Sequence, residues 1–449
     1  MRSLSRHAAA VGAALAVGVA GSLAAAHPAD RTGPPTDRPG PPPDRPGGPP
    51  GRQPLTLGVE ALLEDLEPLR GQRVGLITNP TGVTQDLTHV IDALVAGQES
   101  GGYEVTALYG PEHGVRGGVP AGEYVESYTD ERTGLPVYSL YGETRKPTAE
   151  MLANVDVLLF DIQDIGARFY TYIWTMYYAM EAAAENGTGF MVLDRPNPLG
   201  DHMAGPVLDY PELSSFVGLR EIPLQHGMTV GELARYFNGE LLETPVDLEV
   251  VEMSGYSADD IVEEWDHPWV LPSPNIPTRA TALAYPGTGL IESINVSEGR
   301  GTTTPFLWFG APFIDETESW ALADDLNARG LEGVRFRPAS ATPSASKHAG
   351  EFSGGLEIHI TDPGEYASLR VGLHVLDALF DRIEEVEWRE GAQCQSPEDE
   401  CWIDLLSGSK DVRAQLEADV DPDEILAGFE SELDDFAEEV APYRLYDAG

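Results

Sequence analysis

Short apolar runs alternate with helical stretches from Leu55 onward, and this alternation constrains the fold more than any other feature of the chain. Strands that alternate with helices are typical of a mainly parallel sheet covered by helices. We therefore predict an α/β domain over residues 55–284. The expected strands are Val74–Thr78, Glu104–Tyr109, Val137–Leu140, Val155–Phe160 and Phe190–Leu193, with helices at Thr88–Ala96 and Tyr172–Glu185.

A second, smaller module is expected from about Ala284 to the end of the chain, residues 285–449. The segment Tyr285-Pro286-Gly287-Thr288-Gly289 interrupts the preceding rhythm, as clusters of proline and glycine do between elements. The pattern beyond it predicts a strand at Leu356–Ile360, a helix at Arg370–Ile383 and acidic helices after Pro422. These elements indicate an α+β domain.

The first residues are typical of a secretory signal. Arg2 and Arg6 precede the small, apolar stretch Ala8–Ala26, and no second apolar run of spanning length follows. We predict a signal peptide at residues 1–26, a secreted or extracytoplasmic protein, and no transmembrane span once the signal is removed. A retained membrane anchor is the alternative. Residues 27–54 form a Pro/Gly tract that predicts an extended tether.

The charge balance limits the partners of the protein. With 74 acidic against 28 basic residues the net charge is −46, which disfavours nucleic acid and anionic membranes. We expect a solvated acidic surface of the kind found in salt-adapted proteins. The two cysteines, Cys394 and Cys401, are expected to close a small surface loop as a disulfide. The oligomeric state is left open.

Four of the predicted strands end in polar loops that carry glycine or proline. Because ligands of open α/β sheets bind outside the carboxyl ends of the strands, we expect these loops to converge on one cleft. The loops are Asn79-Pro80-Thr81-Gly82, Pro111-Glu112-His113-Gly114, Asp161–Arg168 and Asp194-Arg195-Pro196-Asn197-Pro198.

Several familiar sites are absent from the sequence. It contains no G-x-G-x-x-G, G-x-x-x-x-G-K-[ST], H-E-x-x-H or G-x-S-x-G motif, which weakens dinucleotide, P-loop, zincin and serine-hydrolase interpretations. We therefore predict neither a cofactor nor a metal. What remains is a set of carboxylates beside aromatic and arginine side chains, a combination that suits glycosidic cleavage.

Glu112 is the first candidate for a catalytic carboxylate. It follows a predicted strand and a proline, precedes His113, and has glycines nearby that leave room for a substrate. The alternative is a carboxylate that caps its own loop. His113 is expected to orient its neighbour or to contact substrate.

Three further carboxylates compete for a second catalytic role. Asp161 and Asp164 end an apolar strand, and Arg168 is near enough in sequence to form a structural ion pair with the first of them. Tyr170 is expected to stack on sugar or to pack. Glu298 lies in the Gly-bearing segment Asn295–Thr303 beside Arg300, which is either a substrate clamp or an internal ion pair.

Five sequence blocks together resemble the exo-β-N-acetylmuramidase family of glycoside hydrolases, from about Leu57 to Tyr446. The blocks are Pro111–Gly114, Phe160–Tyr172, Asp194–Pro198, Ser273–Thr278 and Ser297–Thr303. The resemblance implies a Rossmann-like N-terminal domain, a smaller C-terminal domain and an active site between them. It also implies release of terminal N-acetylmuramic acid from the non-reducing end of peptidoglycan fragments, without nucleotide or metal, and it matches the family's catalytic glutamate to Glu112.

The predicted partner is therefore a muramyl glycan or peptidoglycan fragment. A lactyl carboxylate must approach a strongly negative protein, so nearby arginines would have to offset the field. The main alternative function is a non-catalytic protein that binds cell-wall glycan. A wall esterase or amidase lacks a recognisable nucleophile set. The predicted substrate-binding residues are Asn79, His113, Arg116, Arg168, Tyr170, Arg195, Asn197, Asn275 and Arg300.

Overall fold

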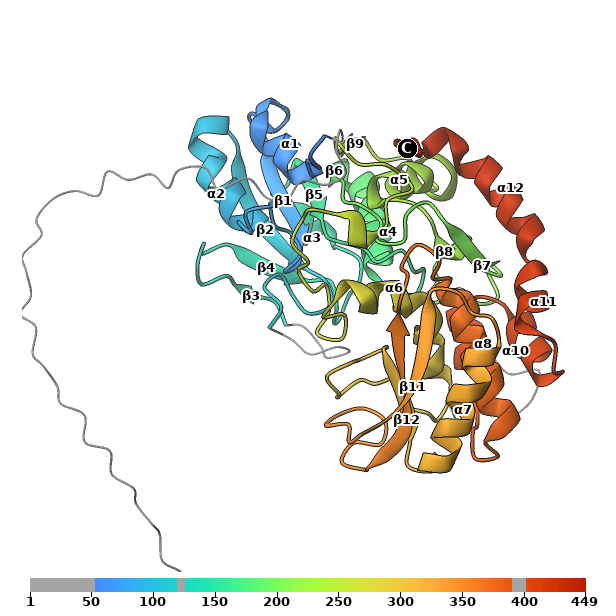
Figure 1. The fold of residues 1–449 in the computed structure, drawn as a ribbon. Helices are drawn as coiled ribbons and strands as arrows, with labels where there is room; N and C mark the ends of the chain where they lie inside the picture. The colour runs from blue at the N-terminus through green and yellow to red at the C-terminus, as the bar shows by residue number, and fades with distance from the viewer. Residues whose placement is uncertain (1–52, 119–125, 390–400) are drawn as a thin grey trace, which may run out of the picture. The chain divides into compact units, whose positions relative to one another are not determined.

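The large sheet follows the alternating pattern of the sequence. In the computed structural model, which describes residues 53–118, 126–389 and 401–449, its seven strands lie in the order β3-β4-β2-β1-β5-β6-β9 (Figure 1). The pair β3–β4 is antiparallel, and all other neighbours are parallel. The strands are β1 Arg73–Thr78, β2 Glu104–Gly110, β3 Tyr128–Thr129, β4 Pro136–Ser139, β5 Val157–Asp161, β6 Gly189–Leu193 and β9 Leu248–Val251.

All five predicted strands of this sheet are confirmed to within two residues, whereas β3 and β9 were not predicted. Both missed strands lie at the edges of the sheet. Their burial is partial, and β3 has only two residues, so neither carries the apolar run that marks the central strands. The prediction of a mainly parallel α/β sheet holds.

Alternate residues of the central strands serve two separate cores. Ile77, Tyr109 and Phe160 point to one face of the sheet, while Leu76 and Leu108 point to the other. All five are fully buried. Because side chains of a strand alternate between faces, a strand buried on both faces appears in sequence as a continuous apolar run.

Helices cover this sheet and begin at side-chain caps where the sequence supplies them. Thr148 and Thr229 accept hydrogen bonds from the first turns of α3 and α5, and Gly102 and Gly187 end α2 and α4 in left-handed conformation. The two predicted helices correspond to α2 and α4. The helices are α1 Gly58–Glu64, α2 Val90–Gly101, α3 Ala149–Leu152, α4 Tyr172–Asn186 and α5 Val230–Tyr236.

The C-terminal part is an α+β arrangement, as predicted. Its three-stranded antiparallel sheet has the order β10-β12-β11, and α7 lies against it with α8 beside α7 (Figure 1). A two-stranded hairpin, β7–β8, precedes it in the chain. The strands are β7 Met203–Val207, β8 Pro223–His226, β10 Trp308–Ala311, β11 Val334–Ala341 and β12 Ser353–Ile360; the helices are α6 Arg279–Thr288, α7 Glu316–Ala328, α8 Ser368–Arg382, α9 Trp402–Ser407, α10 Lys410–Glu417, α11 Pro422–Ala427 and α12 Glu430–Val440.

The expected interruption of regular structure at Tyr285–Gly289 is wrong, because α6 runs through Pro286. The reason is a close helix crossing. A Cβ atom on Gly287 would lie 1.9 Å from the Ser368 carbonyl oxygen, and one on Gly372 would lie 2.3 Å from the Gly287 carbonyl oxygen. The Ser368 hydroxyl donates to the Ala284 carbonyl at 2.9 Å. Because it has no side chain, Gly287 allows α6 and α8 to pack closely against each other.

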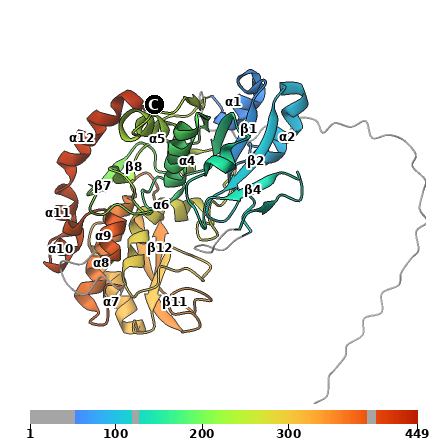
Figure 2. The ribbon, with the colours of Figure 1, turned by 180° about the vertical axis from the view of Figure 1, so that it is seen from behind.

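One core continues from the large sheet into the C-terminal helices. The cluster that contains Phe160 also contains Leu376 and Val440, and the described residues all belong to one compact unit. The chain then returns to the large sheet, where the Tyr446 hydroxyl donates to Asp194 at 2.7 Å. Figure 2 shows α12 running beside the hairpin towards α5. The predicted domain limits at residues 284 and 285 stay a prediction.

The predicted signal peptide and most of the tether lie outside the described residues. Among the helices that the structure does describe, none has the length and apolar character needed to cross a membrane. Cys401 is disulfide-bonded, while Cys394, its expected partner, also lies outside the described residues.

Candidate active site

Polar loops meet at the carboxyl edge of the large sheet. The Gln163 backbone donates to the Thr81 hydroxyl at 2.9 Å, and its side chain donates to the Pro196 carbonyl at 2.7 Å. These bonds join the loops after β1, β5 and β6. The loop that carries Glu112 reaches the same edge because β2 runs parallel to β1. The four loops therefore meet at one edge, as predicted, but only Pro111–Gly114 among them contributes to the pocket and the cleft described next, so convergence of all four on one cleft is not found.

Glu112 lies where a narrow pocket meets a wider cleft. The pocket has a volume of about 70 Å³ and the cleft about 1150 Å³. Because small-molecule pockets usually enclose about 300–1,000 Å³, the narrow pocket has room for part of a ligand and the cleft for a larger one. A carboxylate at the junction faces a ligand that occupies either space. The residues that line both spaces are Glu112, Phe169, Thr171, Asn275, Tyr285 and Arg300.

The turn after β2 presents Glu112 in a constrained geometry. His113 and Gly114 both have positive φ, 70° and 73°, and the Gly114 N–H donates to the Pro111 carbonyl at 2.9 Å. A left-handed histidine is uncommon and costs free energy, which suggests a functional reason for the turn. The His113 ring is buried, and its Nε2 lies 3.2 Å from the Ser273 hydroxyl. His113 therefore links the Glu112 loop to the segment around Ser273 by a hydrogen bond, and it also lines the pocket.

Aromatic side chains from both parts of the chain wall the pocket. Tyr170 contacts Tyr172 and Tyr285 edge-on, with ring centroids 5.0 and 5.7 Å apart, and Tyr285 contacts Phe306 in the same way at 4.7 Å. Phe169 packs on Tyr285 at 5.2 Å. Aromatic faces and edges of this kind bind the apolar patches of sugar rings.

The hydroxyl groups of this wall remain protonated. Burial raises the pKa of Tyr170 well above its usual value, and the neighbouring Tyr172, Tyr285 and Glu112 add to the effect. Burial raises the pKa of Tyr141, at the cleft, to about 12, with Glu112 as the next cause. The Tyr172 hydroxyl donates to the Pro272 carbonyl at 2.7 Å, whereas the buried Tyr170 hydroxyl has no hydrogen bond of normal geometry in the described part of the chain. The Tyr170 hydroxyl thus keeps a donor that no group in the described part of the chain uses.

Asp161 forms a buried ion pair, but not with the partner expected from sequence. Arg195 contacts its two oxygens through Nε at 2.6 Å and Nη2 at 3.1 Å, and the two side chains are 0% and 1% exposed. Arg168 was the wrong choice because strand neighbours, rather than residues near in sequence, lie side by side at the carboxyl edge. Arg195 also donates to the Val83 carbonyl at 2.9 Å. Neither residue lines the pocket or the cleft.

Asp164 is buried beside His226. His226 Nδ1 accepts from the Met228 N–H, which leaves Nε2 to donate to Asp164 Oδ2 at 3.1 Å. The same Oδ2 accepts from the Gly166 N–H at 2.8 Å, while Oδ1 is buried without a hydrogen bond within the described residues. Asp164 lies behind the wall of the pocket rather than in its lining.

Arg168 has a structural environment. Its guanidinium is fully buried and donates to the carbonyls of Pro206, Ile222 and Leu406 at 2.9–3.1 Å. Burial lowers its pKa to about 9. A Cβ atom on Gly408 would lie 2.2 Å from Nη2, so the end of α9 packs directly on the guanidinium. Arg168 thus joins α9 to the hairpin and does not line the pocket.

Three other predicted binding residues also serve their own loops. Arg116 pairs with Asp130 at 2.7 Å and Asp92 at 3.2 Å. Asn79 accepts from the Thr81 backbone at 2.9 Å, and Asn197 donates to the Met228 carbonyl at 3.1 Å. The structure therefore gathers only His113, Tyr170, Asn275 and Arg300 of the predicted binding set around Glu112.

Glu298 and Arg300 form the internal pair that was the alternative to a clamp, within a larger cluster. Arg300 contacts Glu298 at 3.0 Å and Glu292 at 2.8 Å, and Lys347 contacts Glu298 at 3.1 Å. Glu298 is 1% exposed, and the two cations lower its pKa against the opposing effect of burial, which is the largest single influence. All four side chains line the cleft.

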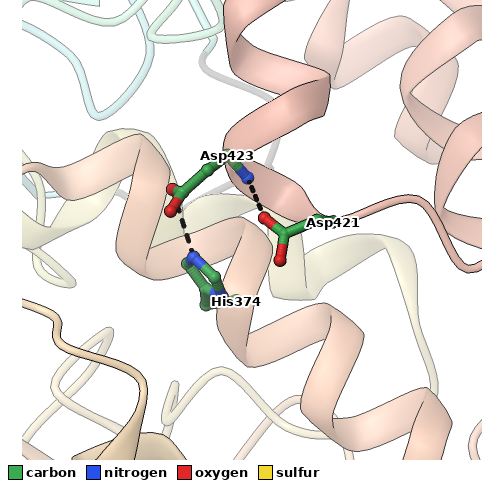
Figure 3. Close-up of side chains that lie close together, drawn as sticks. All are labelled: His374, Asp421 and Asp423. Carbon is green, nitrogen blue, oxygen red and sulfur yellow. Dashed lines mark hydrogen bonds and ion pairs between the residues drawn. The ribbon is translucent and has the colours of Figure 1, made fainter.

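One group of side chains in the described ranges has the spacing of a metal site, away from this pocket. His374, Asp421 and Asp423 lie close together where α8 meets α11 (Figure 3). Their ligand atoms are already engaged: Asp423 accepts from Arg370 at 2.5 and 2.8 Å and lies 3.3 Å from His374, while Asp421 caps α11 through the Asp423 N–H at 2.8 Å. This arrangement stabilises the contact between α8 and α11.

The sequence pattern does not reveal much of the pocket and of the cleft. Tyr285 was assigned to an inter-domain break, and Phe306, Glu292 and Lys347 had no motif to mark them. The one usable signal was the aromatic character of Phe169–Tyr172, which was partly attributed to packing. Residues far apart in sequence reach the pocket only through tertiary packing, so no local pattern identifies them.

Family models match nearly the whole described chain. The model described as "Exo-beta-N-acetylmuramidase NamZ, N-terminal" matches residues 74–280, and the corresponding C-terminal model matches residues 283–446. A curated relative, the peptidoglycan beta-N-acetylmuramidase NamZ of Bacillus subtilis (strain 168), is 48% identical over 392 residues, which is 87% of this chain and 91% of that protein.

Two solved structures are similar to this fold. Both are DUF1343 family proteins from Bacteroides fragilis NCTC 9343. BF0371 has 40% identity and a TM-score of 0.77, covering 88% of this chain and 99% of that one. BF0379 has 27% identity and a TM-score of 0.68, covering 88% of this chain and 100% of that one.

Proposed function

This chain belongs to the exo-β-N-acetylmuramidase family of glycoside hydrolases, and on that basis we propose that it releases terminal N-acetylmuramic acid from the non-reducing end of peptidoglycan fragments, with Glu112 as the catalytic carboxylate. The resemblance found in the sequence blocks is confirmed by the family match. The assignment of Glu112 as the catalytic carboxylate rests, in addition, on the position of its side chain.

The observation that carries the assignment is the place of Glu112 at the junction of pocket and cleft. In this proposal the terminal sugar lies against the aromatic wall that includes Tyr170, Tyr172 and Tyr285, with its glycosidic oxygen next to the Glu112 carboxyl group. In glycoside hydrolysis one carboxylic acid protonates the leaving oxygen, and a second carboxylate activates water or attacks the sugar.

The three candidates for the second carboxylate differ in their surroundings. Asp161 is enclosed in its ion pair with Arg195, and Asp164 lies behind the pocket wall. Glu298 lines the cleft, but Arg300 and Lys347 engage its two oxygens. A water molecule activated by Glu298 would therefore have to compete with two cations. We propose no covalent role for any of the three.

The test is sugar release from a MurNAc-GlcNAc disaccharide and from a chromogenic MurNAc glycoside, followed by mass spectrometry. We expect release by the wild type and a loss on the order of 10²-fold or more in Glu112→Gln, which keeps the shape but removes the acid. Glu99→Gln is the matched control, because this exposed helical residue lies outside the pocket and the cleft.

The rival function, a non-catalytic protein that binds cell-wall glycan, predicts a different outcome. It predicts sugar binding by both the wild type and Glu112→Gln, with no release from any muramyl or glucosaminyl substrate. Full activity of Glu112→Gln would instead retain the enzyme and reject Glu112 as its catalytic group.

We also propose that the protein acts outside the cytoplasm. The support is the sequence itself: Arg2 and Arg6, the small apolar stretch Ala8–Ala26 and the Pro/Gly tract that follows. Peptidoglycan is located there as well. Expression of the full chain in a bacterial host, followed by N-terminal sequencing of the processed protein, should give a start at His27. Recovery of the intact N-terminus in the membrane fraction would favour a retained anchor.

A further inference from the structure

Arg300 is the only lysine or arginine among the described residues that line the narrow pocket. The other arginines that the sequence offered are used elsewhere: Arg195 pairs with Asp161, Arg116 with Asp130, and Arg168 with backbone carbonyls. Among the lysine and arginine side chains of the described residues, an anionic group in the pocket can therefore contact only Arg300.

The Arg300 side chain is held in place before any ligand arrives. Its guanidinium carbon lies 4.8 Å from the centroid of Phe306, and Glu292 and Glu298 hold one terminal nitrogen each. A guanidinium has five N–H donors, so these two contacts leave donors for a ligand. The side chain is 24% exposed, which keeps it reachable from the pocket and the cleft.

The surroundings keep Arg300 charged and limit local repulsion. Although burial opposes it, contact with Glu292 and Glu298 raises the pKa of Arg300 above its usual value. Lys347 shares Glu298 with Arg300 at 3.1 Å, so two cations face two carboxylates in this cluster. Arg389 adds a further cation along the cleft. In a chain of net charge −46, this is a local region that a carboxylate can approach.

We propose that Arg300 binds the lactyl carboxylate of the terminal sugar and thereby determines the preference for muramyl over glucosaminyl ends. The inference rests on the proposed function, because the lactyl group is what distinguishes the two sugars. Planar, charge-assisted recognition of a carboxylate is the typical use of a pre-positioned arginine. In this arrangement Glu292 and Glu298 act as positioning residues for Arg300.

The experiment removes the charge from the ligand and from the protein in turn. Dissociation constants of free MurNAc and of its lactyl methyl ester are measured by calorimetry, and both are also made as chromogenic glycosides. We expect the wild type to favour the acid by about 10- to 100-fold, the range for a charge-assisted contact. Arg300→Gln should bring this ratio close to one.

Two further variants control for charge and folding. Arg337→Gln removes the same charge from an exposed position on β11, 61% exposed, and should keep the wild-type ratio. Arg300→Lys keeps the charge but not the planar fork, so its ratio should fall several-fold. Thermal unfolding checks each variant. If Arg300→Gln does not fold, an unchanged ratio in Arg300→Lys overturns the proposal.

The outcomes distinguish this inference from the proposed function. A wild type that binds acid and ester equally, or a folded Arg300→Gln with the wild-type ratio, overturns the role of Arg300 even if sugar is released. Preference for the acid that depends on Arg300, without any release of sugar, supports the role of Arg300 and rejects hydrolysis.

Discussion

The buried pair of Asp161 and Arg195 gives the sharpest test of which polar residues are structural. Arg195→Met removes the guanidinium and leaves the Asp161 carboxylate at 0% exposure without its cation. It also removes the hydrogen bond from Nη2 to the Val83 carbonyl, 2.9 Å long, which ties the loop after β1 to the loop after β6. The variant should therefore lose stability through an uncompensated buried charge.

The size of the effect follows from burial. Removing one partner of a buried pair typically costs about 3–5 kcal/mol, whereas exposed pairs contribute about 0–1 kcal/mol. The pair of Arg73 and Asp156 is the control, because its side chains are 43% and 36% exposed with a comparable distance of 2.7 Å. We expect Arg195→Met to lower the free energy of unfolding by about 3 kcal/mol or more and Arg73→Met to have a much smaller effect, because solvent screens the exposed pair.

The assay is equilibrium unfolding in urea, measured with activity on the chromogenic glycoside under native conditions. The structural interpretation predicts that Arg195→Met has a lower urea midpoint and that the fraction still folded keeps a near wild-type KM. A variant with wild-type stability and a large fall in kcat would refute the reasoning, because it would place Arg195 in the catalytic site.

Three further predictions follow from the same structure. Gly287→Ala should lower the free energy of unfolding by about 2 kcal/mol or more, because the added methyl group overlaps the Ser368 carbonyl, and it should reduce activity because α6 carries Tyr285. The control Gly364→Ala should be near neutral in urea unfolding, since the added methyl group would meet only one atom, at 3.6 Å. Burial raises the pKa of Asp194 to about 7, so between about pH 4 and 7 the folded state binds a proton that the unfolded state does not. The free energy of unfolding should therefore fall by at most about 1.4 kcal/mol per pH unit as pH rises through that window. Asp194→Asn should remove this slope in unfolding curves measured at several pH values. With a net charge of −46, the Tm measured by calorimetry should rise between 0.1 and 1 M NaCl, as the Debye length falls from about 10 to 3 Å; an unchanged Tm would contradict the salt-adapted interpretation.

The strand pattern alone was enough to locate the sheet and the edge that carries the site. Local sequence determines these features because a strand buried on both faces needs a continuous apolar run, as in β1 and β5, and because parallel strands bring their carboxyl ends to one edge. The position of Glu112 after β2 follows from that rule. The edge strand β3 and the helix through Pro286 do not, since neither has a local apolar period that marks it.

Only the tertiary structure decided which polar side chains serve the pocket. Arg168, Arg195 and Arg300 look alike in sequence, each in a loop within four residues of an acidic residue. Arg168 nevertheless donates to backbone carbonyls, Arg195 neutralises Asp161, and Arg300 faces the pocket. The physical reason is that ion pairs and pocket walls form between residues distant in the chain. Spacing in sequence determines which face a side chain takes on its own element. What that side chain contacts depends on tertiary packing, as in the contacts of Tyr285 on α6 with Phe169 and Tyr170.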